Sequence, residues 1–470
     1  MSSNHQGRFP RRTFLGSLAA TGLATVARSG RTAESDAAFQ VGEAVVDITP
    51  PLGIELGGYH RSPGNERRIR SIRQPTATRA LVLRQAGVTA AMVSLDVAAV
   101  GREMTARIQQ AAAQRTGMAA QNIRVCPTHT HSMPAFCYLR QWGAIPVEYM
   151  ADVEEKTVRA IAMAADDLGP AQLRVGRSRA VGANHNRTTP DFKTDDLFDA
   201  DSTDDDRWLD TMVHVLLFQR PGAKRDLLWY HFSAHPVCYA DEAAGPDWPG
   251  PVAERIKAAH GLEASYLQGH AGDVNPGDGD PWRGDIDKTT QGVYDAICRA
   301  LDDTRLVAVD RLQARTTPMR VPYDMERFRG WLNAYRDDPS QCASGPWVNA
   351  GFAADWFEGN RDRDLNQTHL PITLGALQIG DVGLLFHPAE LYSFYGLAVR
   401  RGSPLVDTLV VGYADDTIGY LTDPRAYQAG EYAAITVPKI LDYPPFTPGA
   451  AAEMTAASID LLRSLHASAG

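Results

Sequence analysis

Two histidines spaced two residues apart carry the clearest chemical signal in the sequence. His129 and His131 lie in the segment Cys126–Ser132, which follows a short β-type run at 121–125. Because successive side chains on a strand point to opposite faces, we expect both imidazoles to project to the same side and share one pocket. Neutral imidazole is the commonest metal ligand and also moves protons near neutral pH, so one ring can bind a metal while the other works beside it. The alternative is a pair of histidines satisfied inside the core.

Three predicted β-hairpins each lead to a residue of the metal-ligand type or of a supporting type. The hairpins are predicted at 80–84 with 90–95, 213–218 with 227–232, and 374–379 with 382–386. Their second strands lead, in the same order, to Asp96, His235 and Glu390. Ligands beyond the carboxyl ends of strands are favoured by α/β architectures. The sequence therefore predicts one metal site at strand C-terminal ends, although hairpins are common and every strand must end somewhere.

Helical patterns alternate with these hairpins. The predicted helices are 102–116, 147–168, 251–260 and 289–302. Mixed strands and helices indicate an α/β (mixed α+β) fold class with a mixed β-sheet. We expect one large catalytic domain over residues 39–470, with a further subregion after residue 310.

Composition sets the class of protein and excludes some partners. The chain has 470 residues, of which 44% are apolar and 22% charged, as in a globular protein with a large core. Its 47 basic and 56 acidic side chains give a formal charge of -9, so nucleic acid is not an expected partner. Five cysteines without a Cys-x-x-Cys pair exclude a disulfide framework and a thiolate zinc site, and leave room for one bridge.

The first 38 residues are predicted to be a targeting segment and a linker. Arg11 and Arg12 precede an apolar stretch from Phe14 to Ala27, which resembles a twin-arginine export signal. The stretch is shorter than the ~20 residues that span a bilayer, so a membrane anchor is disfavoured. We therefore expect a periplasmic or extracellular protein.

Several enzyme classes lack their usual motifs. The sequence contains no Gly-x-Ser-x-Gly elbow, no Gly-Lys-Ser/Thr phosphate loop and no His-Glu-x-x-His helix. The sequence therefore gives no support for a serine esterase, a nucleotide hydrolase or a metalloprotease of the His-Glu-x-x-His type.

Five ordered segments resemble the neutral/alkaline (non-lysosomal) ceramidases. They are Cys126–Ser132, Phe232–Pro236, Gly272–Pro276, the segment around Glu390, and Gly419–Thr422. Each motif alone is weak, whereas the ordered set spans the chain from Val41 to Ala433. The resemblance implies one Zn²⁺ per chain, held by His129, His235, Glu390 and Tyr420.

The resemblance also implies catalytic residues. His131 is expected to take a proton from water and return it to the leaving amine, while Arg187 and Tyr432 stabilise the oxyanion. Tyr420 is an unusual metal ligand that alternatively donates to the carbonyl oxygen. Candidates for orienting a ligand imidazole are Asp96 and Asp273, which equally suit buried caps of strand ends. We expect His231 and His387 to face the core.

Two departures from the family pattern bear on substrate. Asn275 stands in Gly272–Gly277 where the family has a serine, which argues against covalent serine chemistry. We also expect no C-terminal β-sandwich domain of the kind found in ceramidases, which leaves lipid recognition open.

The function expected from these observations is that of an exported zinc-dependent amidohydrolase. It would cleave the N-acyl amide bond of ceramide or a related N-acyl lipid with metal-activated water, and would contact membrane surfaces transiently. Two alternatives remain open at this point. One is a zinc hydrolase of a different secreted amide or ester, and the other is a metal-stabilised binding protein without turnover.

An aromatic segment is predicted to shape the pocket. Trp347, Phe352, Trp356 and Phe357 lie in 345–357, whose apolar spacing is typical of neither a helix nor a strand. We expect a lid or wall over the zinc pocket, because ligand pockets are lined mainly by apolar and aromatic groups. The alternative is a loop that covers the core.

Overall fold

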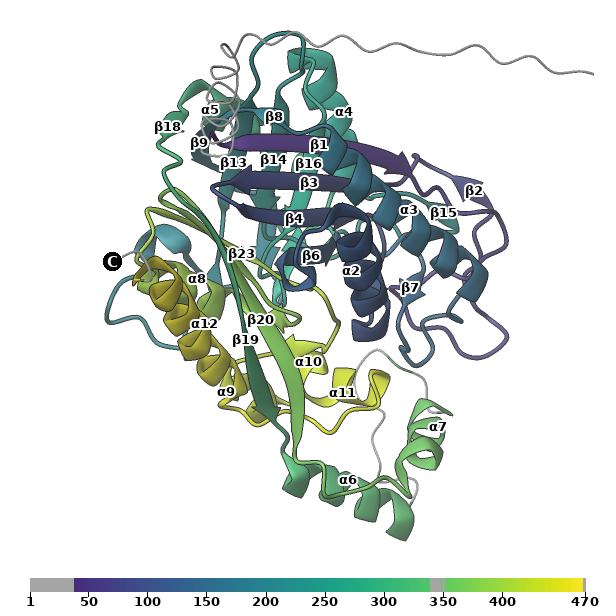
Figure 1. Ribbon diagram of the computed structural model, residues 1–470. Helices are drawn as coiled ribbons and strands as arrows, with labels where there is room; N and C mark the ends of the chain where they lie inside the picture. The colour runs from purple at the N-terminus through teal and green to yellow at the C-terminus, as the bar shows by residue number, and fades with distance from the viewer. Residues whose placement is uncertain (1–37, 339–347, 349–350, 468–470) are drawn as a thin grey trace, which may run out of the picture.

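The computed structural model describes residues 38–338, 348 and 351–467 (Figure 1). The predicted leader up to residue 37, Cys342 and Trp347 lie outside the described residues. The other four cysteines are all free. Within the described ranges, no helix has both the length and the apolar character needed to cross a membrane.

Three large sheets form the frame of the described chain. The first has the strand order β6-β4-β3-β1-β8, with β1 Gln40–Asp47, β3 Ala77–Gln85, β4 Val88–Leu95, β6 Ile123–Pro127 and β8 Gly169–Pro170. The second has the order β16-β14-β13-β9-β18, with β9 Gln172–Arg179, β13 Met212–Gln219, β14 Leu227–Phe232, β16 Ala264–Gln268 and β18 Arg305–Val307. The third has the order β19-β20-β21-β23, with β19 Leu312–Pro322, β20 His369–Ile379, β21 Val382–Phe386 and β23 Asp407–Val411.

The three sheets share one local arrangement. In each, an antiparallel hairpin (β3–β4, β13–β14 or β20–β21) is followed by a helix and then by a strand parallel to the second hairpin strand (β6, β16 or β23). All three predicted hairpins are therefore confirmed, and so is the mixed α/β class. A parallel neighbour needs a crossover helix, and it brings two carboxyl strand ends to the same edge of the sheet.

Helices cover the outer faces of the sheets, as Figure 1 shows. Their bounds are α2 Arg102–Thr116, α3 Val147–Asp166, α4 Pro249–His260, α5 Ile286–Asp302, α8 Ser393–Gly402 and α12 Ala450–Ala467. Helix α2 has the predicted bounds and ends where Gly117 takes a left-handed conformation. Asp285 caps the N-terminus of α5, and its carboxylate accepts from the backbone N–H groups of Asp287 and Lys288.

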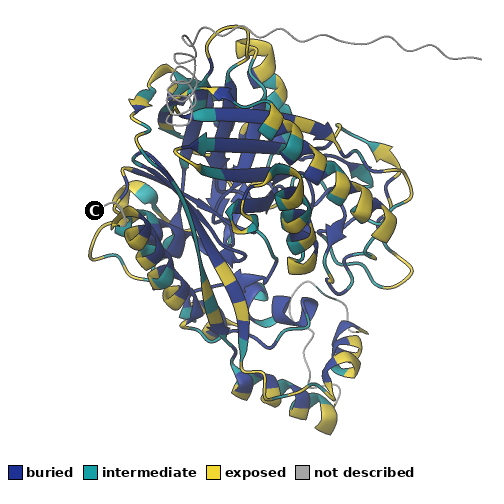
Figure 2. Cartoon of the chain, in the orientation of Figure 1, coloured by how far each residue is buried: buried dark blue, intermediate teal, exposed yellow. Residues whose placement is uncertain are grey.

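The inner faces of the sheets meet in a common core. Leu83 of β3, Trp229 of β14 and Leu384 of β21 are all fully buried in it. Figure 2 shows buried residues in the strands and exposed ones on the outer sides of the helices. Because these strands are buried on both faces, they read as continuous apolar runs rather than alternating ones.

Several two-stranded pairs fix the positions of segments that follow strands of the large sheets. They are formed by β10 Asn184–Asn186 with β17 Val274–Pro276, and by β22 Glu390–Leu391 with β24 Tyr420–Leu421. The parallel β22–β24 pair sets Glu390 directly opposite Tyr420. The remaining short pairs are β5 Ala99–Val100 with β7 Ala135–Phe136, β2 Ser71–Ile72 with β15 Ala243–Ala244, and β11 Lys193–Thr194 with β12 Trp208–Leu209.

The aromatic segment predicted to be a lid is partly a helix. Strands β19 and β20 extend to α6 (Met325–Asp337) and α7 (Gly351–Asn360) at one end of the molecule (Figure 1). Phe352 and Trp356 are fully buried on α7, and Trp356 packs against Phe328 and Trp331. The expected loop was wrong for 351–357, which belong to α7, because Trp356 buries itself against α6.

Candidate active site

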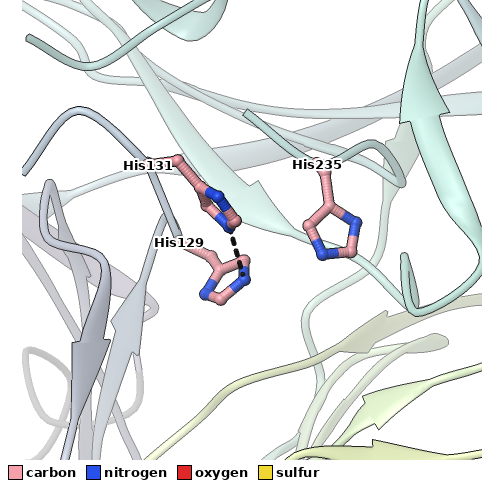
Figure 3. Close-up of side chains that lie close together, drawn as sticks. All are labelled: His129, His131 and His235. Atoms are coloured by element: carbon pink, nitrogen blue, oxygen red, sulfur yellow. Dashed lines mark hydrogen bonds between the residues drawn. The ribbon is translucent and has the colours of Figure 1, made fainter. Parts of the chain in front are cut away.

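Three imidazoles converge beyond the strand ends of the first two sheets. His129 and His131 follow β6 and His235 follows β14, and Figure 3 shows their rings turned toward one another. One ring nitrogen from each lies within 4.8 Å of the others, so this group could hold a metal ion. The Nε2 atoms of His129 and His131 are 3.2 Å apart.

The backbone of this segment differs from the predicted strand. Strand β6 ends at Pro127, and His129 has a left-handed φ of 63°. Neighbouring loops hold the segment instead: the His131 N–H donates to the Pro236 carbonyl, and Arg67 donates to the His131 carbonyl. The two rings share a pocket, but through a strained turn rather than through strand alternation.

Backbone carbonyls orient the two outer imidazoles. His129 Nδ1 lies 2.7 Å from the Ala98 oxygen, and His235 Nδ1 lies 2.9 Å from the Val274 oxygen. Both Nδ1 atoms must therefore carry a proton, which leaves the Nε2 lone pairs directed at the shared site.

The two aspartates considered for that orienting role have other partners. Asp96 accepts from Arg79 and from the Ala77 N–H, and Asp273 accepts from Asn186 and from Ser393. They hold strand and loop ends together, which is the structural alternative that the sequence left open.

Glu390 and Tyr420, which face each other in the short β22–β24 pair, complete the cluster. Glu390 Oε2 lies 3.2 Å from His235 Nε2 and 3.7 Å from His129 Nε2. The Tyr420 hydroxyl lies 3.5 Å from His235 Nε2. The predicted ligands His129, His235, Glu390 and Tyr420 are thus brought to one place, although they are 291 positions apart along the chain at most.

This donor set suits a divalent cation. Burial lowers the pKa of His129 to about 4 and lowers that of His235 well below its usual value, so both rings are neutral and offer lone pairs. Glu390 is 5% exposed, and in the described part of the chain no lysine or arginine nitrogen lies within 4.0 Å of its carboxylate. Buried charge without a counter-ion is costly, and a bound cation would remove that cost.

His131 is placed differently from the two outer imidazoles. Its Nδ1 is buried and has no hydrogen-bond partner among the described residues. Burial and then the neighbouring imidazoles lower the pKa of His131, so the ring is neutral and able to accept a proton. Tyr59 and Trp142 pack edge-on against it, each with its ring centroid 5.3 Å away. Gly58 lies so close that an added Cβ would be 2.5 Å from the His131 Cβ, so this approach requires glycine.

Arg187 lies beside the cluster on the loop after β10. It donates to the Tyr420 hydroxyl at 2.7 Å, to the Gly272 carbonyl at 2.8 Å and to Asn275 Oδ1 at 3.2 Å. Burial opposes its charge, but Tyr420, Tyr392 and Glu390 together outweigh burial and raise the pKa of Arg187. The Tyr432 ring centroid is 6.4 Å from that of Tyr420, and burial raises the pKa of the Tyr432 hydroxyl, which stays protonated.

The cluster lies at the wall of a cavity of about 590 Å³. The lining includes His129, His131, Arg187, Glu390, Tyr420 and Tyr432. An apolar wall is formed by Leu139, Trp142, Ala433, Val437, Ile440 and Leu441, which come from the loop after β7 and from α10 (Tyr432–Ile435) and α11 (Val437–Ile440). Phe352 and Trp356 do not line this cavity.

Other histidines behave as predicted, and some site residues were missed. His231 and His387 are fully buried and lie outside the cavity lining. The sequence did not single out Tyr59, Trp142 or Tyr413, whose ring stacks on His129 at 4.3 Å. A signal existed for Tyr59 alone, since Gly57 and Gly58 before it indicate close backbone approach.

The N-terminal part of the chain is similar to one known protein family. Residues 39–244 match the family model described as neutral/alkaline non-lysosomal ceramidase, N-terminal. The predicted resemblance is confirmed. No curated protein sequence matches this chain.

Solved structures extend the likeness to the fold of nearly the whole chain. A neutral ceramidase from Pseudomonas aeruginosa superposes with a TM-score of 0.69 at 20% identity, over 92% of this chain and 75% of that one. A structure described as ceramidase complexed with C2 also gives a TM-score of 0.69, at 19% identity, over 92% and 76%. At these identities the likeness establishes a ceramidase-like fold.

Proposed function

We propose that this protein is a zinc-dependent amide hydrolase of the ceramidase type. The family match and the fold support a ceramidase-type hydrolase. The observation that carries the proposal is the convergence of two carbonyl-oriented imidazoles and a buried carboxylate beside a third imidazole with a free Nδ1.

The metal ligands in this proposal are His129, His235 and Glu390, with Tyr420 as a fourth donor. A bound Zn²⁺ would supply a Lewis acid that polarises the amide carbonyl and lowers the pKa of a water from 15.7 to about 7. The geometry supports this set because the two Nδ1 atoms are fixed by carbonyls while both Nε2 atoms are free to bind.

His131 serves as the proton carrier. Its ring is neutral, lies against His129 and lines the cavity, so it can accept a proton from the attacking water. Its Nδ1 has no fixed partner, so no backbone group dictates which nitrogen carries the proton. The same ring then returns the proton to the leaving amine, which departs as a neutral group.

Arg187 and Tyr432 stabilise the oxyanion that develops as the carbonyl is attacked. Both line the cavity, and Arg187 keeps its charge at neutral pH. The Arg187–Tyr420 hydrogen bond holds the phenol at the edge of the cluster, where it can bind metal or donate to the oxyanion.

The apolar wall favours an acyl chain as one half of the substrate. An amide with a fatty acyl group would bury that chain against Leu139, Trp142 and α11. Ceramide or another N-acyl lipid is thus the proposed substrate class, presented from a membrane surface or as a monomer.

Release of free amine from a panel of N-acyl substrates, with and without a chelator, tests the proposal. We expect amide turnover that a chelator abolishes and that added Zn²⁺ restores. Turnover of esters alone would favour the alternative substrate class, and binding without any turnover would favour the non-catalytic alternative.

We also propose that residues 1–38 direct export of a single catalytic domain, 39–470. The support is Arg11-Arg12 before the apolar stretch from Phe14. Export by a route that carries folded proteins would allow metal loading before transport. Fractionation of cells that express the wild type or the Arg11→Lys/Arg12→Lys variant tests this, and equal export of both would contradict it.

A further inference from the structure

Asn275 links the candidate catalytic arginine to a loop at the cavity wall. Its Oδ1 accepts from Arg187 at 3.2 Å, and its Nδ2 donates to the Trp282 carbonyl at 3.0 Å. A serine has one short hydroxyl, whereas the asparagine amide offers an acceptor and a donor on separate atoms. The residue that departs from the family pattern therefore fixes the loop that carries Arg283.

Arg283 lies at the cavity wall, and its side chain is exposed. Its guanidinium carbon is 5.5 Å from the centroid of the Tyr59 ring, and that ring packs edge-on against His131. In the part of the chain that the structure describes, no ion pair within 4.0 Å neutralises Arg283. The guanidinium therefore stands one aromatic ring away from the proposed proton carrier.

The cavity carries excess positive charge although the chain as a whole is acidic. Among the described residues that line it are three arginines, Arg61, Arg187 and Arg283, and two carboxylates, Glu390 and Glu431. Glu390 belongs to the proposed metal set, and Glu431 already accepts from Arg207 and from Tyr392. With a net charge of -9 for the whole chain, positive charge concentrated here indicates a ligand with negative charge.

We propose that the substrate is an N-acyl amino acid, an amide whose amine half carries a carboxylate that binds at Arg283. The proposal rests on the amide hydrolase function proposed above. The apolar wall takes the acyl chain, so the anionic group must belong to the other half of the amide. Water adds across the C–N bond and yields a fatty acid and a free amino acid, so no further reactant is needed.

A matched pair of substrates isolates the carboxylate. N-dodecanoylglycine and N-dodecanoylethanolamine share the acyl chain and the amide, and they differ in a carboxylate against a hydroxymethyl group. For the zinc-loaded wild type we expect kcat/KM to favour the glycine conjugate by about fivefold, as one partly exposed ion pair allows. The preference should shrink as salt concentration rises, because screening weakens exposed pairs.

Variants identify the residue responsible. Arg283→Gln should bring the kcat/KM ratio of the two substrates close to one, and Arg283→Lys should restore part of it. Asn275→Ser should lower the same ratio by raising KM for the glycine conjugate, because the loop that carries Arg283 loses the hydrogen bond from Asn275 to the Trp282 carbonyl. Arg329→Gln, an exposed arginine on α6 outside the cavity lining, is the control and should keep the wild-type ratio.

The outcomes separate this inference from the function on which it rests. Hydrolysis of both amides with no preference, or a preference that Arg283→Gln leaves unchanged, would overturn the inference and leave the hydrolase function standing. If neither amide nor a ceramide is hydrolysed, the proposed function itself fails, and the inference fails with it.

Discussion

Two groups of buried histidines lie on the same three-sheet frame, yet only one faces a cavity. The interior group comprises His214, His231, His270 and His387. Its members lie on or just after β13, β14, β16 and β21, and two of these strands, β14 and β21, also lead to the site residues His235 and Glu390. His231 precedes His235 by four residues, and His387 precedes Glu390 by three.

The groups differ in where their ring nitrogens point. In the interior group, His231 Nε2 lies 2.9 Å from the Val410 oxygen and His270 Nε2 lies 3.0 Å from Asp210 Oδ2. Neighbouring rings there stand 6.0 and 6.4 Å apart between centroids. Among the described residues, the site group alone brings three ligand-type atoms close enough for one metal ion. In the site, the Nδ1 atoms of His129 and His235 are hydrogen-bonded to backbone carbonyls, and their Nε2 atoms face the shared site. The difference teaches that burial and residue type do not make a metal site, whereas the direction of the lone pairs does.

The double variant His129→Ala/His235→Ala should give the largest effect on activity. Removal of two of the proposed ligands should abolish zinc binding and lower kcat/KM by at least about 10³-fold, since metal catalysis contributes several kcal/mol. Zinc content measured by elemental analysis, together with amine release, checks this. Equal zinc content in the variant and the wild type would show that the two histidine groups do not differ in metal binding.

His131→Ala distinguishes two ligand sets within the site. If His131 carries protons, the variant should keep its zinc and lose about 10² to 10⁴-fold in kcat, the usual contribution of general acid–base catalysis. Elemental analysis and kcat should be measured on the same sample. Loss of zinc in this variant would instead assign the metal to the three-histidine group His129, His131 and His235.

Tyr432→Phe should have a smaller effect. It removes the hydroxyl of a residue that lines the cavity, and the loss of one oxyanion donor costs about 10²-fold in kcat. Zinc content and melting temperature should stay at wild-type values, because the ring remains. An unchanged kcat would remove Tyr432 from the catalytic set and leave Arg187 as the proposed oxyanion donor.

Asp210→Asn tests the interior histidine group. It should have the smallest effect on activity of these variants. Asp210 accepts from Arg400 at 3.0 and 2.6 Å and lies 3.0 Å from His270, so neutralising it leaves Arg400 without its carboxylate. We expect a loss of about 3 kcal/mol in the free energy of unfolding, near the lower end for a broken buried pair. Urea denaturation measures it, and zinc stoichiometry below the melting transition should not change. Loss of zinc without loss of stability would mean that the interior group supports the metal directly.

Local sequence determined the repeated elements and the residue types of the site. Continuous apolar runs such as 227–232 and 382–386 read as buried strands, and α2 ended at Gly117 as predicted, because these signals depend only on neighbouring residues. The ligand-type residues His129, His235 and Glu390 stood just beyond those strands in the sequence. Order and spacing were sufficient to indicate the family.

Contacts between distant segments decided the rest. The left-handed turn at His129, the carbonyls of Ala98 and Val274 that fix the imidazoles, and the burial of Trp356 against α6 all depend on residues far away in the chain. Asp96 and Asp273 could not be assigned from the sequence, because a buried carboxylate suits a strand end and an imidazole equally well. Only the folded chain decided which partner stands within hydrogen-bond distance, since that depends on how three separate sheets pack together.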